Sequence, residues 1–205
     1  MKTITELKPQ ANNNKRVSVY LNGAYYCGLD LLTVMQARLK VGQEIDENTL
    51  VEIQRSSEAQ ACFDSALNFI SKSVKTEREI KDKLIKKGYL EEIVLETLEK
   101  LKSYNFVNDK DYINRYVSTY KNNKSKKLIK FELQKKGVNK LDVDECLDEI
   151  ESEFETALKI AEKYVKNKEK DDKTFQKCYK YLLSKGFSYD DSLNATKKVI
   201  NIEEY

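Results

Sequence analysis

Few side chains in this chain of 205 residues have the chemistry or the spacing of a catalytic or metal-binding group. Histidine is absent, which removes serine–histidine and cysteine–histidine catalysis and every histidine-ligated metal site. The four cysteines lie 35, 84 and 32 residues apart, with no Cys-x-x-Cys pair, at Cys27, Cys62, Cys146 and Cys178. We therefore expect isolated reduced thiols, no metal and no cofactor.

Acidic residues gather between Asp142 and Glu155, where eight carboxylates occur with no basic residue. Paired carboxylates can serve hydrolysis or hold a metal, but no glycine-rich phosphate loop or histidine accompanies these. Apolar residues recur within the run at helical spacing, which favours an exposed helix face, at Val143, Leu147, Ile150 and Phe154. Mimicry of nucleic-acid charge, or contact with a basic partner, is the alternative interpretation. We expect a protein that is not an enzyme.

Basic residues gather just before this run, because the segment from Lys121 to Gly137 contains seven lysines against Glu132 alone. Ammonium groups can neutralise a phosphate backbone without reading its sequence, or can contact a protein filament. A solvated helix face is the plainer interpretation. The candidate filament-binding or DNA-binding residues are Arg115, Lys121, Lys124, Lys126, Lys127, Lys130, Lys135 and Lys136.

Helical spacing divides the basic run into two faces. Lys126, Lys127 and Lys130 are three or four residues apart and can share one face. The buried face is expected to consist of Leu128, Phe131 and Leu133. Before the run, tyrosines recur every four residues, at Tyr112, Tyr116 and Tyr120. Aromatic rings can stack on bases, but this period predicts the packing stripe of a helix.

The composition favours a helix-rich protein without membrane contact. Charged residues make up 35% of the chain and hydrophobic residues 40%, and the formal net charge is +3. The only proline is Pro9, so the residue that most strongly breaks helices is absent from the rest of the chain. No apolar stretch of signal-peptide or membrane-spanning length follows Met1. We expect a cytoplasmic location.

The N-terminal region is expected to form a small β-hairpin, because Asn22-Gly23 is a favoured pair for a two-residue turn. Its strands are Arg16 to Leu21 and Ala24 to Leu29. Direct pairing across the turn would put Val19 beside Tyr26 on one face, with Cys27 on the other. The hairpin should dock on the helix that follows, since two strands alone are marginally stable in water.

Two helices are expected after the hairpin. Asp30 is placed to cap a helix that ends at Gly42, and Asp46 is placed to cap the next. Apolar residues continue the helical period from Leu50 toward Ser73.

The rest of the chain contains an internal repeat with a period of 49 residues, marked by Lys87-Gly88, Lys136-Gly137 and Lys185-Gly186. Four residues before each glycine stands a leucine, at Leu84, Leu133 and Leu182. Each glycine suits the left-handed position that ends a helix, so each repeat should contain a helical hairpin. Capping boxes are expected at the starts of helices, at Thr76 with Glu79, Asp142 with Glu145 and Ser188 with Asp191.

A preceding helix completes each repeat, at about 61–73, 109–121 and 155–168. The expected fold is mainly α, with three tandem three-helix repeats that form an elongated curved arm after the N-terminal hairpin and helices. The expected divisions are an N-terminal extension over residues 1–60 and repeats over 61–108, 109–154 and 155–205.

Several segments of this pattern resemble the RecX family, whose members carry three tandem three-helix repeats. The segments are Thr76 to Gly88, Phe106 to Val117 and Ile129 to Val138, together with Arg38 to Asp46 in the extension. The chain departs from the family at Ser125-Lys126, where a Gly-Pro pair is common. It also departs in the third repeat, where Cys178 and Thr196 occupy core-type positions.

The resemblance implies a regulator that binds the groove of RecA filaments on single-stranded DNA. We expect the chain itself to be a monomer. Such a protein would inhibit the recombinase's ATP turnover and strand exchange. Some family members also bind single- or double-stranded DNA directly. The alternative is therefore a general DNA-binding protein that uses the lysine-rich helix face.

Overall fold

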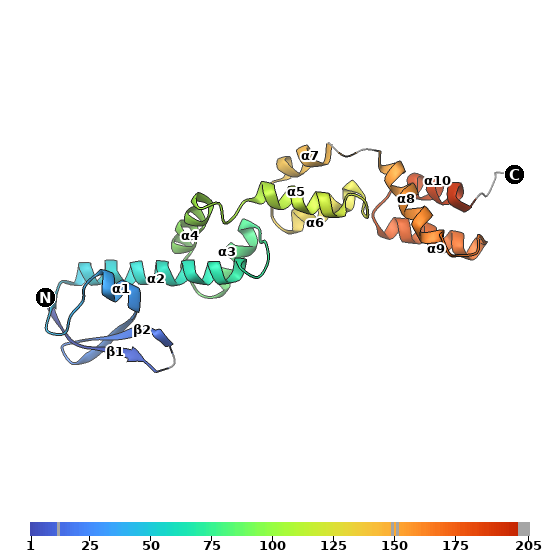
Figure 1. Cartoon of the computed structure of the whole chain (residues 1–205). Helices are drawn as coiled ribbons and strands as arrows, with labels where there is room; N and C mark the ends of the chain where they lie inside the picture. The colour runs from blue at the N-terminus through green and yellow to red at the C-terminus, as the bar shows by residue number, and fades with distance from the viewer. Residues whose placement is uncertain (12, 149, 151, 201–205) are drawn as a thin grey trace. The chain divides into compact units, whose positions relative to one another are not determined.

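The structure, a computed structural model, describes residues 1–11, 13–148, 150 and 152–200, which divide into two compact units (Figure 1). The first unit comprises Met1–Lys75 and Glu79–Val107, and the second comprises Thr76–Arg78 and the residues from Asn108 onward. The strands are β1 (Lys2–Gln10), β2 (Asn13–Leu21), β3 (Ala24–Asp30) and β4 (Glu44–Ile45). The helices are α1 (Leu31–Gln36), α2 (Glu47–Ile70), α3 (Glu77–Lys86), α4 (Glu91–Ser103), α5 (Asp109–Tyr120), α6 (Lys126–Lys135), α7 (Lys140–Asp148), α8 (Glu153–Val165), α9 (Asp172–Ser184) and α10 (Tyr189–Ile200).

The N-terminal strands form a four-stranded antiparallel sheet in the order β3-β2-β1-β4. The expected hairpin of β2 and β3 is confirmed, but the expectation of only two strands is wrong. β1 pairs along the length of β2, with Pro9 opposite Val17, and β4 adds a short fourth strand through Lys2 and Ile45. Ile4 is fully buried against β2, so the sheet has a core that a lone hairpin would lack.

The pairing of β2 with β3 contains a β-bulge, so the predicted faces of β3 are wrong beyond the turn. Tyr20 pairs with Tyr25, but Val19 pairs with Cys27, which leaves Tyr26 as the extra residue. The bulge moves Cys27 and Leu29 to the side of the sheet that packs on the core. Direct pairing would have left Cys27 on the opposite face.

Both aspartates expected to cap helices do so, but the helix lengths differ from the prediction. The Asp30 carboxylate accepts from the amide of Leu32, and α1 ends at Gln36 rather than Gly42. Asp46 accepts from the amide of Thr49 at 2.9 Å and starts α2. α2 then runs unbroken for 24 residues, so the separate helix expected from residue 61 is the second half of α2.

The first unit contains the first group of three helices, formed by the second half of α2 with α3 and α4 (Figure 1). Its core contains Ile80 and Leu84 from α3, and Leu98 and Leu101 from α4. Gly88 has a φ of 92°, and the amides of Gly88 and Tyr89 donate to carbonyls of the last turn of α3. This glycine therefore ends α3 in the predicted way and lets α4 turn back against it.

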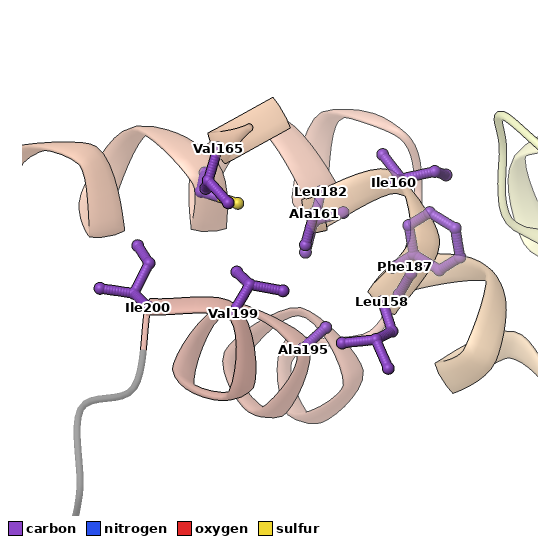
Figure 2. Packing of buried hydrophobic residues seen from close by; sticks show 11 residues of the cluster. Leu158, Ile160, Ala161, Val165, Leu182, Phe187, Ala195, Val199 and Ile200 are labelled. Carbon is purple, nitrogen blue, oxygen red and sulfur yellow. The ribbon is translucent and has the colours of Figure 1, made fainter. Parts of the chain in front are cut away.

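The second unit contains the other two groups of three helices, α5–α7 and α8–α10, and each group has its own core. Figure 2 shows Ala161 of α8, Leu182 of α9 and Val199 of α10 in the core of the last group. Cys178 and Thr196 are fully buried here, where the earlier repeats have larger side chains. The mainly helical fold with tandem three-helix groups is thus confirmed, whereas the exact repeat boundaries remain predictions.

Of two helix starts predicted in the second unit, one agrees with the structure and the other does not. Ser188 is confirmed as a cap, because its hydroxyl accepts from the Asp191 amide at 3.0 Å and donates to the Asp191 carboxylate at 2.8 Å. The prediction for Asp142 is wrong, since α7 begins earlier, at Lys140. There the side chain of Asn139 accepts from the amide of Leu141 at 2.8 Å. A search of the described helices finds none with both the length and the apolar character needed to span a membrane.

Candidate binding surface

Helix α6 carries four of the eight predicted basic residues, and its first turn is capped by Ser125. The Ser125 hydroxyl accepts from the amide of Leu128 at 3.1 Å and caps the helix. Ile129 and Leu133, four residues apart, are fully buried in the α5–α7 core. Phe131 is 52% exposed, so its prediction as a buried residue is wrong. Successive helical residues are about 100° apart, which turns Phe131 away from the face that Ile129 and Leu133 share.

Lys124 lies inside a cluster of aromatic and acidic side chains. Its ammonium is 2.6 Å from the Glu132 carboxylate and 4.0 Å from the centre of the Tyr120 ring. The Tyr116 hydroxyl donates to the same carboxylate at 2.6 Å. The tyrosines at 112, 116 and 120 are partly buried against the core, as their period predicts. The charge of Lys124 is therefore already compensated within the chain.

Two members of this cluster, Tyr116 and Glu132, have shifted pKa values. Burial raises the pKa of Tyr116, and its hydrogen bond to ionised Glu132 raises the pKa further. Burial also acts to raise the pKa of Glu132, but the hydrogen bonds from Lys124 and Tyr116 outweigh it. The pKa of Glu132 is therefore below its ordinary value of 4.5, and the carboxylate stays ionised at neutral pH.

Two more of the candidate lysines have partners within the chain. Lys130 forms an ion pair with Asp144, which joins the basic helix α6 to the acidic helix α7. The ammonium of Lys135 lies 4.3 Å from the centre of the Phe131 ring. Lys136 follows the last residue of α6, and its backbone carbonyl accepts from the hydroxyl of Thr76.

The remaining candidates form no ion pair with any residue that the structure describes. They are Arg115 on α5, Lys121 after it, and Lys126 and Lys127 in the first turn of α6. Arg115, Lys121 and Lys127 are exposed, and Lys126 is half-buried. These cations can therefore meet an acidic or phosphate partner without first breaking an internal ion pair.

A groove of about 730 Å³, which Lys127 helps to line, lies between α6 and the turn that joins α9 to α10. Its lining is largely apolar and includes Leu128, Phe131, Leu183, Phe187 and Tyr189, with Lys127 at its edge. Tyr189 is 74% exposed. Sequence reasoning missed the residues from α9 and α10, although the recurrence of Lys185-Gly186 marked the turn that carries them.

The closeness of α6 to this turn depends on Gly186. Its φ is 87°, and a Cβ atom at this position would lie 2.6 Å from the Ser125 hydroxyl and 2.7 Å from Cβ of Leu128. The amide of Ser125 also donates to the carbonyl of Lys185 at 3.0 Å. The wall of the groove is therefore built on a backbone contact that only glycine permits.

The same kind of joint occurs twice within the second unit. The hydroxyl of Thr76 donates to the carbonyl of Lys136 at 2.8 Å, as the amide of Ser125 donates to Lys185. One residue later, the helix amides of Glu77 and Lys126 donate to carboxylates at 2.9 and 2.7 Å, on Asp109 and Glu153. Carboxylates are favourable acceptors at the start of a helix. The residue that precedes α3 or α6, the middle helix of its group, thus contacts the Lys-Gly turn of the following group.

Three protein-family models match this chain. They are described as "Regulatory protein RecX N-terminal domain" over residues 2–46, "RecX, first three-helix domain" over 62–101 and "RecX, third three-helix domain" over 151–195. "Regulatory protein RecX" of Clostridium botulinum (strain Alaska E43 / Type E3) is 35% identical, and the alignment covers 100% of both chains.

Two solved structures are also similar to this chain. "Crystal structure of regulatory protein RecX" superposes with a TM-score of 0.65 at 28% identity and covers 99% of this chain and 100% of that one. "Crystal structure of RecX from Lactobacillus salivarius" has a TM-score of 0.58 at 30% identity and covers 72% of this chain and 99% of that one. The likeness therefore extends over the sheet and the helical groups.

Proposed function

Because the chain belongs to the RecX family of regulatory proteins, we propose that it binds the groove of RecA filaments on single-stranded DNA and inhibits their ATPase and strand exchange. The observation that carries this proposal is the apolar groove beside α6, with exposed aromatic rings and adjacent lysines that lack internal ion pairs. Exposed aromatic residues are enriched at protein-binding surfaces.

Within this surface, we propose different roles for the candidate residues. Phe131 and Tyr189 are the anchors, since aromatic side chains at the centre of an interface contribute most of its binding energy. Lys126 and Lys127, with Arg115 and Lys121, steer the encounter with an acidic surface. Lys124 holds the helix in place through Glu132, whereas Lys130 pairs with Asp144 and also lines the groove.

The proposal is tested by the DNA-dependent ATPase of the cognate RecA. Wild-type protein is expected to suppress the ATPase at substoichiometric or near-equal amounts. The double variant Phe131→Ala/Tyr189→Ala should need at least about tenfold more protein for the same effect, because each lost anchor costs about 1–2 kcal/mol. The matched control is Leu95→Ala/Leu141→Ala, which removes two exposed apolar side chains outside the groove.

A pull-down on ATP-loaded filaments, with free RecA as the comparison, identifies the partner form. Retention on filaments and not on free RecA is expected, because the proposal places the contact in the filament groove. Unchanged ATPase and strand exchange at saturating wild-type protein would overturn the proposal. If the Phe131→Ala/Tyr189→Ala variant inhibits as well as wild type, the contact with the filament does not lie in the groove.

The second candidate function is direct DNA binding, which the exposed Lys127 and the neighbouring Lys126 favour. Phosphate contacts make affinity fall steeply with salt. Loss of two contacts in Lys126→Glu/Lys127→Glu should flatten the log–log salt slope for single strands by about 1.4. If this variant loses DNA binding but still inhibits RecA, DNA contact is not the mechanism of inhibition.

A further inference from the structure

The first unit contains a polar pocket that the proposed function does not use. It is about 290 Å³ in volume and lies between the strands β2 and β3, the helix α2 and the turn between α3 and α4. An adjoining space of about 520 Å³ opens beside it. Five of the lining residues are shared by both spaces, namely Arg16, Ser57, Ala61, Lys87 and Tyr89. Segments far apart in sequence therefore meet around one hollow.

Two cations in this pocket have only neutral partners. The guanidinium of Arg16 donates to the carbonyl of Gly28 at 2.8 Å. The ammonium of Lys87 donates to the hydroxyl of Ser65 at 2.5 Å. Among the residues that the structure describes, neither Arg16 nor Lys87 forms an ion pair. Two positive charges that line one pocket without an ion pair favour an anion between them.

Hydroxyl groups supply further donors at the same place. Ser57 is almost fully buried, and its hydroxyl accepts from the amide of Asp30. Ser65 is also buried, and the Tyr89 hydroxyl donates to the carbonyl of Ala61 at 3.1 Å. A guanidinium, an ammonium and hydroxyls that can reorient form the donor set that phosphate oxygens prefer.

The carboxylates around the pocket limit the charge of the ligand. Asp30 already accepts from the amide of Leu32, and Asp64 accepts from the side chain of Gln60 at 2.9 Å. Glu58 lines only the adjoining space. These acids oppose a highly charged ligand such as a triphosphate, because they face the same hollow. A single phosphate group adds the least negative charge to a pocket in which Lys15, Arg16 and Lys87 face Asp30 and Asp64.

We propose that Arg16 and Lys87, assisted by the hydroxyls of Ser57, Ser65 and Tyr89, bind one phosphate group in this pocket. The group is a phosphate monoester or diester, and its source is either a free small molecule or the backbone of a nucleic acid. The ammonium of Lys87 exchanges its bond to Ser65 for the phosphate oxygen, and Arg16 offers the N–H groups that do not reach Gly28.

Calorimetric titration and thermal unfolding of the full chain test this site with three probes. The probes are inorganic phosphate, deoxythymidine monophosphate and a twelve-residue oligodeoxythymidylate, each in a buffer without other phosphate. At least one probe should bind, and at a concentration 100-fold above its Kd it should raise Tm by about 5 °C or more. Binding of the oligonucleotide alone identifies a nucleic-acid backbone, and binding of the monophosphate or phosphate identifies a small ligand.

The decisive variants are Lys87→Gln and Lys86→Gln, which remove the same charge from neighbouring positions. Lys86 is exposed and does not line the pocket, so it is the matched control. Lys87→Gln and Arg16→Gln should each weaken binding about tenfold or more, and Lys86→Gln should leave it within about twofold. Equal binding by the Lys86→Gln and Lys87→Gln variants, or no binding of any probe by wild type, would overturn the site. Neither result depends on the recombinase.

Discussion

Among single residues, Glu132 is the acceptor shared by Lys124 and Tyr116, and its removal should destabilise the second unit. The side chains of Lys124 and Glu132 are 18% and 30% exposed, so water replaces the lost bonds only in part. Glu132→Gln should lower the free energy of unfolding by about 1–2 kcal/mol. Urea denaturation at pH 7 measures the change, and Glu145→Gln, at an exposed position on α7, is the control.

This effect of Glu132 should depend on pH in a defined direction. The pKa of Glu132 is lower in the folded chain than its ordinary value of 4.5. Its stabilising contribution is therefore present above pH 4.5 and is lost as the pH falls through the lower folded pKa. The difference between wild type and Glu132→Gln should shrink between pH 7 and pH 3. A constant difference across that range would contradict the assignment.

The sequence predicted which residues could form a basic surface but not which of them are paired within the chain. The period of four predicted the tyrosine stripe correctly, because neighbours on one helix are fixed by local geometry. The partner of Lys130 is Asp144 on another helix, and such pairing depends on how helices pack. For the same reason, spacing alone did not show that Phe131 lies in a groove completed by Tyr189.

Among the elements, the turn between α9 and α10 gives a test of the contact at Gly186. Gly186→Ala would require a left-handed backbone and would also press a methyl group against Ser125 and Leu128. Gly88→Ala has the same backbone cost, of about 1–2 kcal/mol, but meets no atom within 4 Å. We expect Gly186→Ala to cost about 1–3 kcal/mol more than Gly88→Ala. Equal losses in chemical denaturation would mean that α6 does not press on the turn.

The elements differed most from the sequence prediction in the sheet. β1 carries charged residues and Pro9, and it has no turn pair like the Asn22-Gly23 that identified β2 and β3. The sequence did not predict the bulge at Tyr26, which lies in a strand that packs against α2. Helix ends were predicted best at Gly88, Gly137 and Gly186, all three of which have positive φ. A left-handed residue is a local requirement that glycine meets most easily.

Across the whole molecule, the reactivity of each buried cysteine measures how well a different core excludes a thiol reagent. Cys27, Cys62 and Cys178 are buried in three different cores, and burial raises the pKa of each thiol. Cys146 is half-buried, and its thiol donates to the side chain of Asn114 at 3.3 Å. We expect Cys146 to react first with a thiol-specific disulfide reagent at pH 8, well ahead of the buried thiols.

The control for this labelling order is the Cys146→Ser variant, in which the fast reaction with the thiol reagent should be absent. In intermediate denaturant, mass spectrometry of the labelled peptides compares Cys62 in the first unit with Cys178 in the second. Fast labelling of two or more thiols in the native chain would contradict the burial of the cores. The elongated curved arm and the monomeric state remain predictions, for which solution scattering is the appropriate measurement.

The joint between a middle helix and the following Lys-Gly turn spans the same length of chain both times. Thr76 is 60 residues before Lys136, and Ser125 is 60 residues before Lys185. Both ends of the connection therefore recur with the 49-residue period. A chain with one such period duplicated would repeat both ends of this connection, the helix start and the Lys-Gly turn, in register. The number of repeats can therefore change in evolution while the same contact between a helix start and a Lys-Gly turn is kept.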